Sequence, residues 1–283
     1  MSKKLKEDRN YTGYVAVMWI LYLIPISFVI IVFIAAAKGE LGEMPSIEQL
    51  ENPKTNLATT IYSSDGIVLG KFYLNDNRTP INFSELPENI IDALIATEDE
   101  RFYSHSGIDF KGTLRAIFYL GKKGGASTIT QQLARQLFVG IRSRNKIEAI
   151  TQKLKEWMLA VKLERRFTKN EINSMYLNIY DFGSQADGIE SAAKIYFNKK
   201  PSDLLLEESA TLVGMLKNSS LYNPRRRVKL TTDRRNIVFN QMFRNELLSK
   251  NELDSLRRLP LIIKFTPDSH REGLATYFRA YIQ

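Results

Sequence analysis

The sequence contains no cysteine. Disulfide bonds and thiolate metal ligands are therefore excluded, while the redox compartment is left open. Zinc-finger ligand sets and aromatic RNP-type runs are also absent, so the basic charge does not point to nucleic acid. The sequence has no internal repeat and no low-complexity tract. A chain of 283 residues with these properties suits one large domain with appendages.

The formal net charge is +9, which favours an anionic partner such as a membrane surface or a phosphorylated substrate. Residues 14–37, in contrast, carry no charged side chain. At about 1.5 Å per residue this stretch can cross a hydrocarbon core of about 30 Å, so we predict a transmembrane helix. A cleaved signal peptide ending near residues 35–37 is the alternative. Four basic residues precede the stretch (Lys3, Lys4, Lys6 and Arg9), and they place residues 1–13 in the cytoplasm.

The remaining chain divides into a short β region and a long helical one. Residues 38–80 are predicted as a spacer with a β-hairpin, because strand-like runs at 59–62 and 67–73 flank Ser63-Ser64-Asp65-Gly66. Helical patterns dominate residues 81–250, so the fold class is mainly α. Thr128 with Gln131, and Thr168 with Glu171, fit capping boxes. Residues 251–283 are predicted as the start of a linker towards a further domain.

Two helical segments have apolar faces with a predicted role. In residues 146–167 an apolar stripe is predicted to enter the core; it comprises Ile147, Ile150, Leu154, Trp157, Met158 and Val161. In residues 110–120 apolar side chains alternate with basic ones, which predicts either a membrane-surface element or a core helix. The apolar ones are Phe110, Leu114, Ile117, Phe118 and Tyr119; the basic ones are Lys111 and Arg115, and Lys122 and Lys123 follow directly after the segment.

A carboxylate interrupts an apolar helical stripe at Glu98. At about 100° per residue, Ile91, Leu94 and Phe102 fall on one face of a helix entered through Pro87, and Glu98 projects from that face. An acid there is partly desolvated, which raises its pKa unless a cation lies nearby, and this prepares a general base or acid. The alternative is a carboxylate at a helix end that pairs with a lysine or an arginine.

Two further elements suit an anion. Residues 124–135 read Gly-Gly-Ala-Ser-Thr-Ile-Thr-Gln-Gln-Leu-Ala-Arg, so glycines precede a helix N-terminus and Arg135 adds a cation. No Walker A pattern is present, and a plain capped helix is the alternative. Lys153 and Glu156 lie three residues apart on a helix and could supply a cation for a phosphate and a second carboxylate. A solvated ion pair is the alternative there.

In this order, and behind a predicted membrane anchor, the three elements resemble the peptidoglycan glycosyltransferase domain (glycosyltransferase family 51) of bifunctional class A penicillin-binding proteins. The resemblance is continuous from Pro80 to Met242. It extends to Tyr176-Leu177-Asn178, Gly183, Gly188, Ala192-Ala193, Tyr196-Phe197, Tyr222-Asn223-Pro224, Arg234-Arg235 and Val238. It implies that residues 81–250 form a lysozyme-like domain with two lobes around a cleft that holds Glu98.

The resemblance also implies the chemistry. Glu98 would be the catalytic base that takes the proton from the sugar 4-hydroxyl of lipid II, and Glu156 the second carboxylate near the donor's undecaprenyl diphosphate. The product would be a β-1,4-linked glycan formed with inversion. The implied substrate contacts are Asp99, Phe102, His105, Ser127, Thr128, Gln131, Gln132, Arg135, Lys153 and Asn178. No organic cofactor is implied, only a divalent cation such as Mg²⁺ or Mn²⁺ at the diphosphate, with no metal ligands identified.

Within this set, His105 is interpreted as a hydrogen-bonded structural histidine. Tyr176, Asn178 and the Arg234-Arg235 pair are interpreted as scaffold. The implied partners are lipid II, the nascent glycan strand, the membrane and other cell-wall synthesis proteins. The implied location is the bacterial inner membrane, crossed once, with the catalytic domain in the periplasm.

The sequence departs from the family pattern at two positions. Gln152 directly precedes Lys153, at a position where the family usually has arginine. One expected cation is therefore missing unless Lys146 or Lys155 replaces it. Ser174 stands where a glutamate is usual, and we predict a structural role for it. Ser143-Arg144-Asn145-Lys146 matches Ser-x-x-Lys by letter, but no partner motif follows, so no transpeptidase site is predicted within these residues.

Two rival functions remain. A lysozyme-like enzyme that cleaves the same glycan also uses glutamates. The cations and the segment 124–135 favour transfer over cleavage, because a hydrolase needs no diphosphate site. A membrane-anchored scaffold with a decayed site is conceivable because of Gln152, although both Glu98 and Glu156 are retained.

Overall fold

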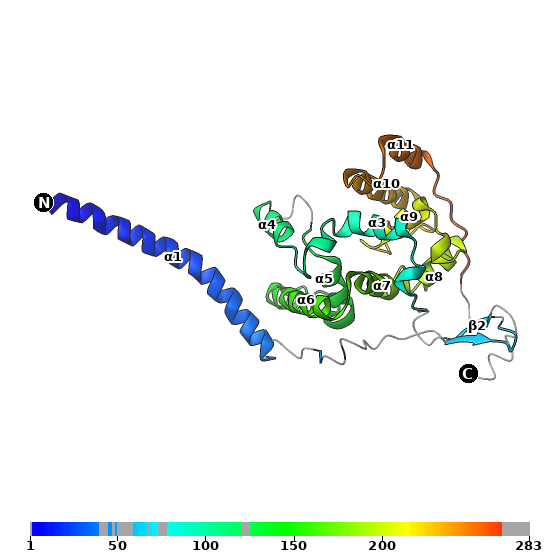
Figure 1. Ribbon diagram of the computed structural model, residues 1–283, viewed down its shortest axis with the longest axis horizontal. Helices are drawn as coiled ribbons and strands as arrows, with labels where there is room; N and C mark the ends of the chain where they lie inside the picture. Colours follow the sequence, from blue (N-terminus) through cyan, green and yellow to red (C-terminus); the bar gives the residue numbers. More distant parts are fainter. Residues whose placement is uncertain are drawn as a thin grey trace.

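The structure is a computed structural model that describes residues 2–39, 45–46, 49, 59–66, 68–72, 78–119 and 125–267. It is mainly helical, as predicted (Figure 1). The first helix, α1 (Ser2–Ala37), is drawn apart from the helical body in Figure 1 and contains the predicted span 14–37. Over the residues that the structure describes, no helix combines the length and the apolarity that a membrane span requires.

The predicted β-hairpin is confirmed. Strands β1 (Thr59–Tyr62) and β2 (Val68–Phe72) pair antiparallel, with Thr59 opposite Phe72. The turn between them is closed by the Gly66 N–H, which donates to the Ser63 carbonyl at 3.0 Å. Gly66 has φ of +82°, a conformation that glycine adopts without steric cost.

The helical body places Glu98 where two groups of helices meet. The body consists, in chain order, of η1 (Phe83–Glu85), α3 (Glu88–Glu98), η2 (Phe102–Ser104), α4 (Phe110–Phe118), α5 (Ile129–Ala134), the π-helix η3 (Arg135–Val139), α6 (Lys146–Arg166), α7 (Lys169–Ile179), α8 (Gly188–Phe197), η4 (Pro201–Asp203), α9 (Leu206–Met215), α10 (Val228–Arg244) and α11 (Lys250–Arg258). Helix α3 packs against α9 and α10, while α5 packs against α6 and α7. Glu98, at the end of α3, contacts Gln132 of α5 and Arg234 of α10, so this end lies between the two groups.

One of the two predicted capping boxes is complete, and the other is only half-formed. At Thr168 the capping box is complete, because Thr168 Oγ1 accepts from the Glu171 N–H and Glu171 Oε2 accepts from the Thr168 N–H. At Thr128 the hydroxyl oxygen accepts from the Gln131 N–H at 3.1 Å. The Gln131 side chain does not return to the cap but donates to the Gly107 carbonyl. The Gln131 side chain therefore links α5 to the loop that contains Gly107.

Helix α6 buries a different face from the one predicted. Ile147 and Ile150 are 76% and 56% exposed, and the other four residues of the predicted stripe are only half-buried, so the predicted core stripe is wrong along the whole helix. The buried residues are Glu156, Leu159, Ala160 and Leu163. All four lie in the second half of the helix. The periodicity correctly predicts an apolar face. Among the described residues, however, no element buries this face over the first turns of the helix.

Helix α4 is not a core helix. Phe110, Leu114 and Phe118 are 69%, 56% and 81% exposed, and Tyr119 is also exposed. This contradicts the core alternative and favours the membrane-surface element. Lys122 and Lys123 of that prediction lie outside the described residues.

The segment predicted to start a linker at residue 251 is attached to the body as far as the structure describes it. Residues 250–258 form α11, which packs against α10. Further on, the Lys264 N–H donates to the Tyr196 carbonyl at 2.9 Å and the Thr266 N–H donates to the Ile195 carbonyl at 2.8 Å. The chain after α11 is therefore hydrogen-bonded to the end of α8. Residues 268–283 of the predicted linker lie outside the described residues.

Candidate active site

Glu98, the last residue of α3, lines a cleft of about 440 Å³. Its side chain is 15% exposed. Gln132 Nε2 donates to Glu98 Oε2 at 3.0 Å, and Arg234 Nη2 lies 3.5 Å from Glu98 Oε1. The Tyr176 hydroxyl donates to Gln132 Oε1 at 2.9 Å, which turns the amide N–H towards Glu98. The carboxylate is therefore held by donors on both oxygens while the cleft gives it access to a substrate.

The contact with Arg234 matches part of the simpler interpretation of Glu98, a helix-end carboxylate paired with a cation. It also corrects the prediction that both arginines of the 234–235 pair are scaffold. Arg234 lines the cleft, and its Nε donates to the Gly214 carbonyl at 3.3 Å. Arg235 is fully buried and donates to the Leu259 carbonyl at 2.7 Å, so it alone is scaffold. Adjacent helical residues point about 100° apart, and the sequence did not indicate which one faces Glu98.

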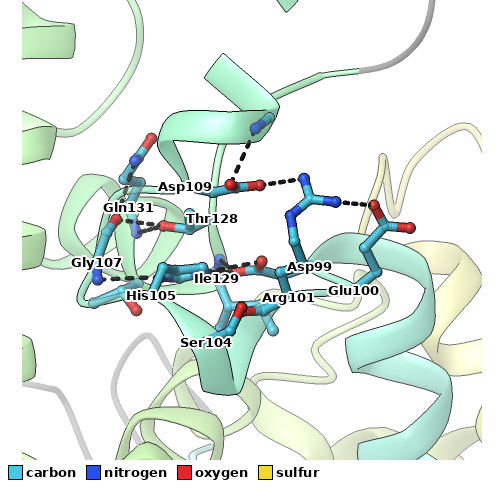
Figure 2. Close-up of polar contacts among 12 residues, drawn as sticks. Asp99, Glu100, Arg101, Ser104, His105, Gly107, Asp109, Thr128, Ile129 and Gln131 are labelled. Atoms are coloured by element: carbon cyan, nitrogen blue, oxygen red, sulfur yellow. Dashed lines mark hydrogen bonds and ion pairs between the residues drawn. The ribbon is translucent and has the colours of Figure 1, made fainter. Parts of the chain in front are cut away.

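Asp99 and His105 connect the segment that follows α3 to the N-terminus of α5 (Figure 2). His105 Nε2 lies 3.0 Å from both Asp99 carboxylate oxygens. The Gly107 N–H donates to His105 Nδ1 at 3.2 Å, so Nε2 carries the hydrogen that Asp99 accepts. Asp99 Oδ2 also accepts from the Ile129 N–H, the first of helix α5, at 3.1 Å. His105 is therefore hydrogen-bonded in the structural manner that the sequence favoured.

Gly107 is the residue at which the segment after α3 contacts α5. Its carbonyl accepts from Thr128 Oγ1 at 2.8 Å and from Gln131 Nε2 at 3.1 Å, as Figure 2 shows. Its φ is +88°, and a Cβ there would lie 2.8 Å from the Ala160 carbonyl carbon. A side chain would meet rigid backbone of α6, so glycine is required for both conformation and space.

We expect Gly107→Ala to lower the free energy of unfolding by about 2–5 kcal/mol, as the sum of left-handed strain and overpacking. Gly66→Ala is the matched control, because Gly66 has φ of +82° and no atom within 4 Å of its added Cβ. That control should lose only about 1–2 kcal/mol. Urea unfolding of both variants measures the difference. Equal losses would mean that the contact with Ala160 is not restrictive.

Ion pairs at the rim of the cleft attach α4 to the segment that follows α3. Arg101 pairs with both Asp109 and Glu100, and Arg115 of α4 lies 3.5 Å from Glu100. Asp109 Oδ1 accepts from the Gly112 N–H at 3.0 Å in the first turn of α4 (Figure 2). Burial by itself would raise the pKa of Asp109, but the hydrogen bonds from Arg101 and Gly112 hold this pKa below its usual value. The exposed apolar face of α4 is therefore anchored to the cleft.

A second polar cluster surrounds Glu156. Its side chain is only 2% exposed, so the solvated ion pair considered for Lys153 and Glu156 is wrong. Lys153 Nζ donates to Glu156 Oε2 at 2.9 Å, to Gln131 Oε1 at 2.8 Å and to Ser127 Oγ at 2.9 Å. An ammonium has three hydrogens, and all three have acceptors here. Gly124, at the start of the predicted anion-binding segment, lies outside the described residues.

The cluster carries a surplus of positive charge. Arg142 Nη2 lies 3.8 Å from Glu156 Oε1, on the other oxygen from Lys153. Burial lowers the pKa of the Lys153 ammonium, and the charges of Arg142 and Arg135 act in the same direction against that of Glu156. Arg135 opens the π-helix η3, a distortion that is frequent at functional sites. Two cations pair with one buried carboxylate and the charge of a third acts on Lys153, and this surplus favours binding of an anion.

The lowered pKa of Lys153 predicts a pH dependence for anion binding. We expect affinity for a phosphoglycolipid transferase inhibitor to fall as the pH rises, beginning below the ordinary lysine value of 10.5. The folded protein releases this proton before the unfolded chain does, so this group makes the fold more stable as the pH rises across that window. The lost affinity would therefore not reflect unfolding. Lys153→Arg keeps its charge and should shift the decline upwards in an inhibitor titration at several pH values; an unshifted decline would assign it to another group.

Three of the residues discussed from the sequence act as scaffold in this structure. Phe102 is fully buried, with Lys169 Nζ 4.2 Å from its ring centroid. Asn178 Nδ2 donates to the Ile81 carbonyl at 2.8 Å, while its Oδ1 accepts from the Ile81 N–H at 3.2 Å. Ser174 Oγ donates to the same carbonyl at 2.8 Å, which confirms its structural role. Phe102 has no exposed surface for the substrate contact that was predicted.

The donor set does not fit a protein-held metal ion. Within the described ranges, no group of three or more His, Asp or Glu side chains could hold one. The oxygens of Glu156 face Lys153 and Arg142 instead. Both oxygens of Glu156 therefore already face a cationic side chain. The divalent cation stays a prediction from the sequence.

Fold and site define a mainly helical protein in which a carboxylate in a cleft lies next to a cationic cluster, an arrangement suited to general-base chemistry on an anionic substrate. The chain belongs to the Transglycosylase family, whose sequence model matches residues 65–243.

Two similar proteins carry the same name. Penicillin-binding protein 1A of Pseudomonas aeruginosa is 34% identical over 244 residues, which cover 84% of this chain and 29% of the relative. Penicillin-binding protein 1A of Escherichia coli is 35% identical over 219 residues, covering 76% of this chain and 25% of the relative. The chain thus spans less than a third of the length of these relatives. The crystal structure of Penicillin-Binding Protein 1A from Haemophilus influenzae aligns at 24% identity over 81% of this chain and 24% of that chain; the TM-score of 0.42 is too low to define the fold.

Proposed function

We propose that this chain is a peptidoglycan glycosyltransferase that polymerises lipid II into glycan strands. One observation carries the proposal: the cleft that contains Glu98 and the groove that contains Lys153 are both lined by Ala126 and Ser127. A candidate base and candidate phosphate-binding cations thus lie on two sides of the same short segment. Membership of the Transglycosylase family supports the same reaction class.

In the proposed reaction Glu98 takes the proton from the 4-hydroxyl of the acceptor sugar. The hydroxyl oxygen bonds to the anomeric carbon of the donor glycan as the bond from that carbon to the diphosphate breaks on the opposite face. The result is a β-1,4 bond formed with inversion, and undecaprenyl diphosphate leaves. Lys153 and Arg135 stabilise the charge that develops on the departing diphosphate, which lowers the barrier more than it strengthens ground-state binding.

The cationic cluster favours this reaction over its rivals. A lysozyme-like hydrolase also works with carboxylates, but it has no departing diphosphate to stabilise. A scaffold without activity has no need of a cleft carboxylate held by both Gln132 and Arg234. These contacts favour a maintained catalytic site.

Incubation of the purified chain with lipid II tests the proposal. We expect polymeric glycan strands and released undecaprenyl diphosphate. Cleavage of preformed strands without polymerisation would support the hydrolase, and a folded chain with neither activity would support the scaffold.

We also propose that the chain is attached to the bacterial inner membrane through the uncharged stretch 14–37, with its N-terminus in the cytoplasm and the catalytic domain in the periplasm. The four basic residues before this stretch and the exposed apolar face of α4 support this location. The nascent glycan strand and other cell-wall synthesis proteins are the proposed partners. Resistance to alkaline extraction from membranes, together with protease access only from the periplasmic side, tests the topology.

A further inference from the structure

The side chain of Gln152 is occupied by the loop that precedes α6. Gln152 Oε1 accepts from the Ser143 N–H at 2.8 Å, and Gln152 Nε2 donates to the Ile141 carbonyl at 3.1 Å. These two contacts bracket residue 142 on both sides. Both polar ends of the amide are used on backbone, so Gln152 holds this loop against α6.

The residue held in this way is Arg142. Its Nη2 lies 3.8 Å from Glu156 Oε1, which is long for a hydrogen bond, and its side chain is 51% exposed. It lines the open groove of about 430 Å³ that Ser127 and Lys153 also line. A guanidinium has five N–H donors, so Arg142 keeps most of its donors for a ligand in this groove.

Lys153 has fewer free hydrogen-bond donors than Arg142. Its three hydrogens already have Ser127, Gln131 and Glu156 as acceptors. Binding of an anion by Lys153 must displace one of these bonds, whereas binding by Arg142 displaces none. Among the described residues, the ion pairs to Glu156 come from Lys153 and Arg142, and neither Lys146 nor Lys155 takes part.

We propose that Arg142 is a further cation that contacts the ligand's phosphate in this groove, in addition to Lys153 and Arg135, and that Gln152 is a positioning residue that orients it. The ligand class is a diphosphate ester, and this part of the inference rests on the proposed function. In this arrangement the glutamine does not mark a missing charge. The charge comes from the loop, and Gln152 fixes the loop that carries it.

The test measures binding of inorganic diphosphate to the full chain by calorimetry, in one detergent and at one ionic strength. We expect Arg142→Ala to weaken binding by about tenfold or more, as for a lost charge-assisted hydrogen bond, and Arg142→Lys to recover part of the loss. Arg144→Ala is the matched control, because Arg144 is an exposed arginine of the same loop. It should bind diphosphate like the unmodified chain. Unchanged affinity in Arg142→Ala, or an equal loss in Arg144→Ala, would overturn the assignment.

A double-variant cycle tests the positioning role. Gln152→Ala should weaken diphosphate binding severalfold in the unmodified chain and have little further effect when combined with Arg142→Ala, because the two residues act through one contact. A general structural defect would give additive losses and would exclude positioning. We expect Gln152→Arg to lose affinity too, since it breaks both loop contacts; a gain would contradict the proposal.

Lipid II polymerisation, followed in parallel, separates this inference from the proposed function. If the unmodified chain polymerises lipid II and Arg142→Ala binds diphosphate normally, only the inference fails. If diphosphate binds through Arg142 but the unmodified chain never polymerises lipid II, the proposed function fails, and with it the assignment of the groove to a lipid-linked sugar.

Discussion

Glu98→Gln should lower the rate of lipid II polymerisation by at least about a hundredfold, the low end of what a general base contributes. Glutamine keeps the size of the side chain and removes its ability to accept the hydroxyl proton. Substrate binding should change little, so the loss should appear in kcat. Arg234, whose side chain is 9% exposed, loses its charged partner, and we expect stability to fall by about 1–2 kcal/mol.

The rate of strand formation from lipid II measures this effect. Glu88→Gln is the matched control, because Glu88 is an exposed glutamate in the first turn of the same helix. It should keep normal turnover. Near-normal turnover in Glu98→Gln, with the control also normal, would show that Glu98 is not the base.

Lys153→Met should lower polymerisation by about 10²–10³-fold, the range found when one donor to a developing oxyanion is removed. Methionine fills most of the volume of the lysine stem but carries no charge, so the departing diphosphate loses a cation next to Ser127. Glu156 remains 2% exposed with only the long contact to Arg142, so the fold should also lose stability. Affinity for a phosphoglycolipid transferase inhibitor should fall as well.

Two measurements separate these effects. Thermal unfolding reports the stability loss, and inhibitor titration below the unfolding temperature reports the lost cation. Arg135→Ala should weaken the same inhibitor without the stability loss, because no hydrogen bond or ion pair joins Arg135's side chain to another of the described residues. Unchanged inhibitor affinity in both variants would place the phosphate site elsewhere.

The local features of this protein follow from its sequence alone. Pro87 and the apolar residues after it set the start of α3 and put Glu98 near its end. The run Ser63-Ser64-Asp65-Gly66 set the hairpin turn, and Thr168 with Glu171 set the start of α7. Each of these depends on contacts within a few residues of chain, where backbone preferences and hydrogen bonds act directly. Such features can be predicted without knowledge of the packing.

Which side chains contact one another depends on how the helices pack. The sequence contains the pair Arg234-Arg235 but not the orientation of α10 that turns Arg234 towards Glu98. It shows Gln152 as a lost cation, whereas the folded loop places Arg142 near Glu156 and uses Gln152 to hold it. It shows an apolar stripe on α6 but not that Ile147 finds no cover among the described residues. The physical reason is common to all three: periodicity gives the face of a helix on which a side chain lies, while its partners depend on how elements distant in sequence pack together.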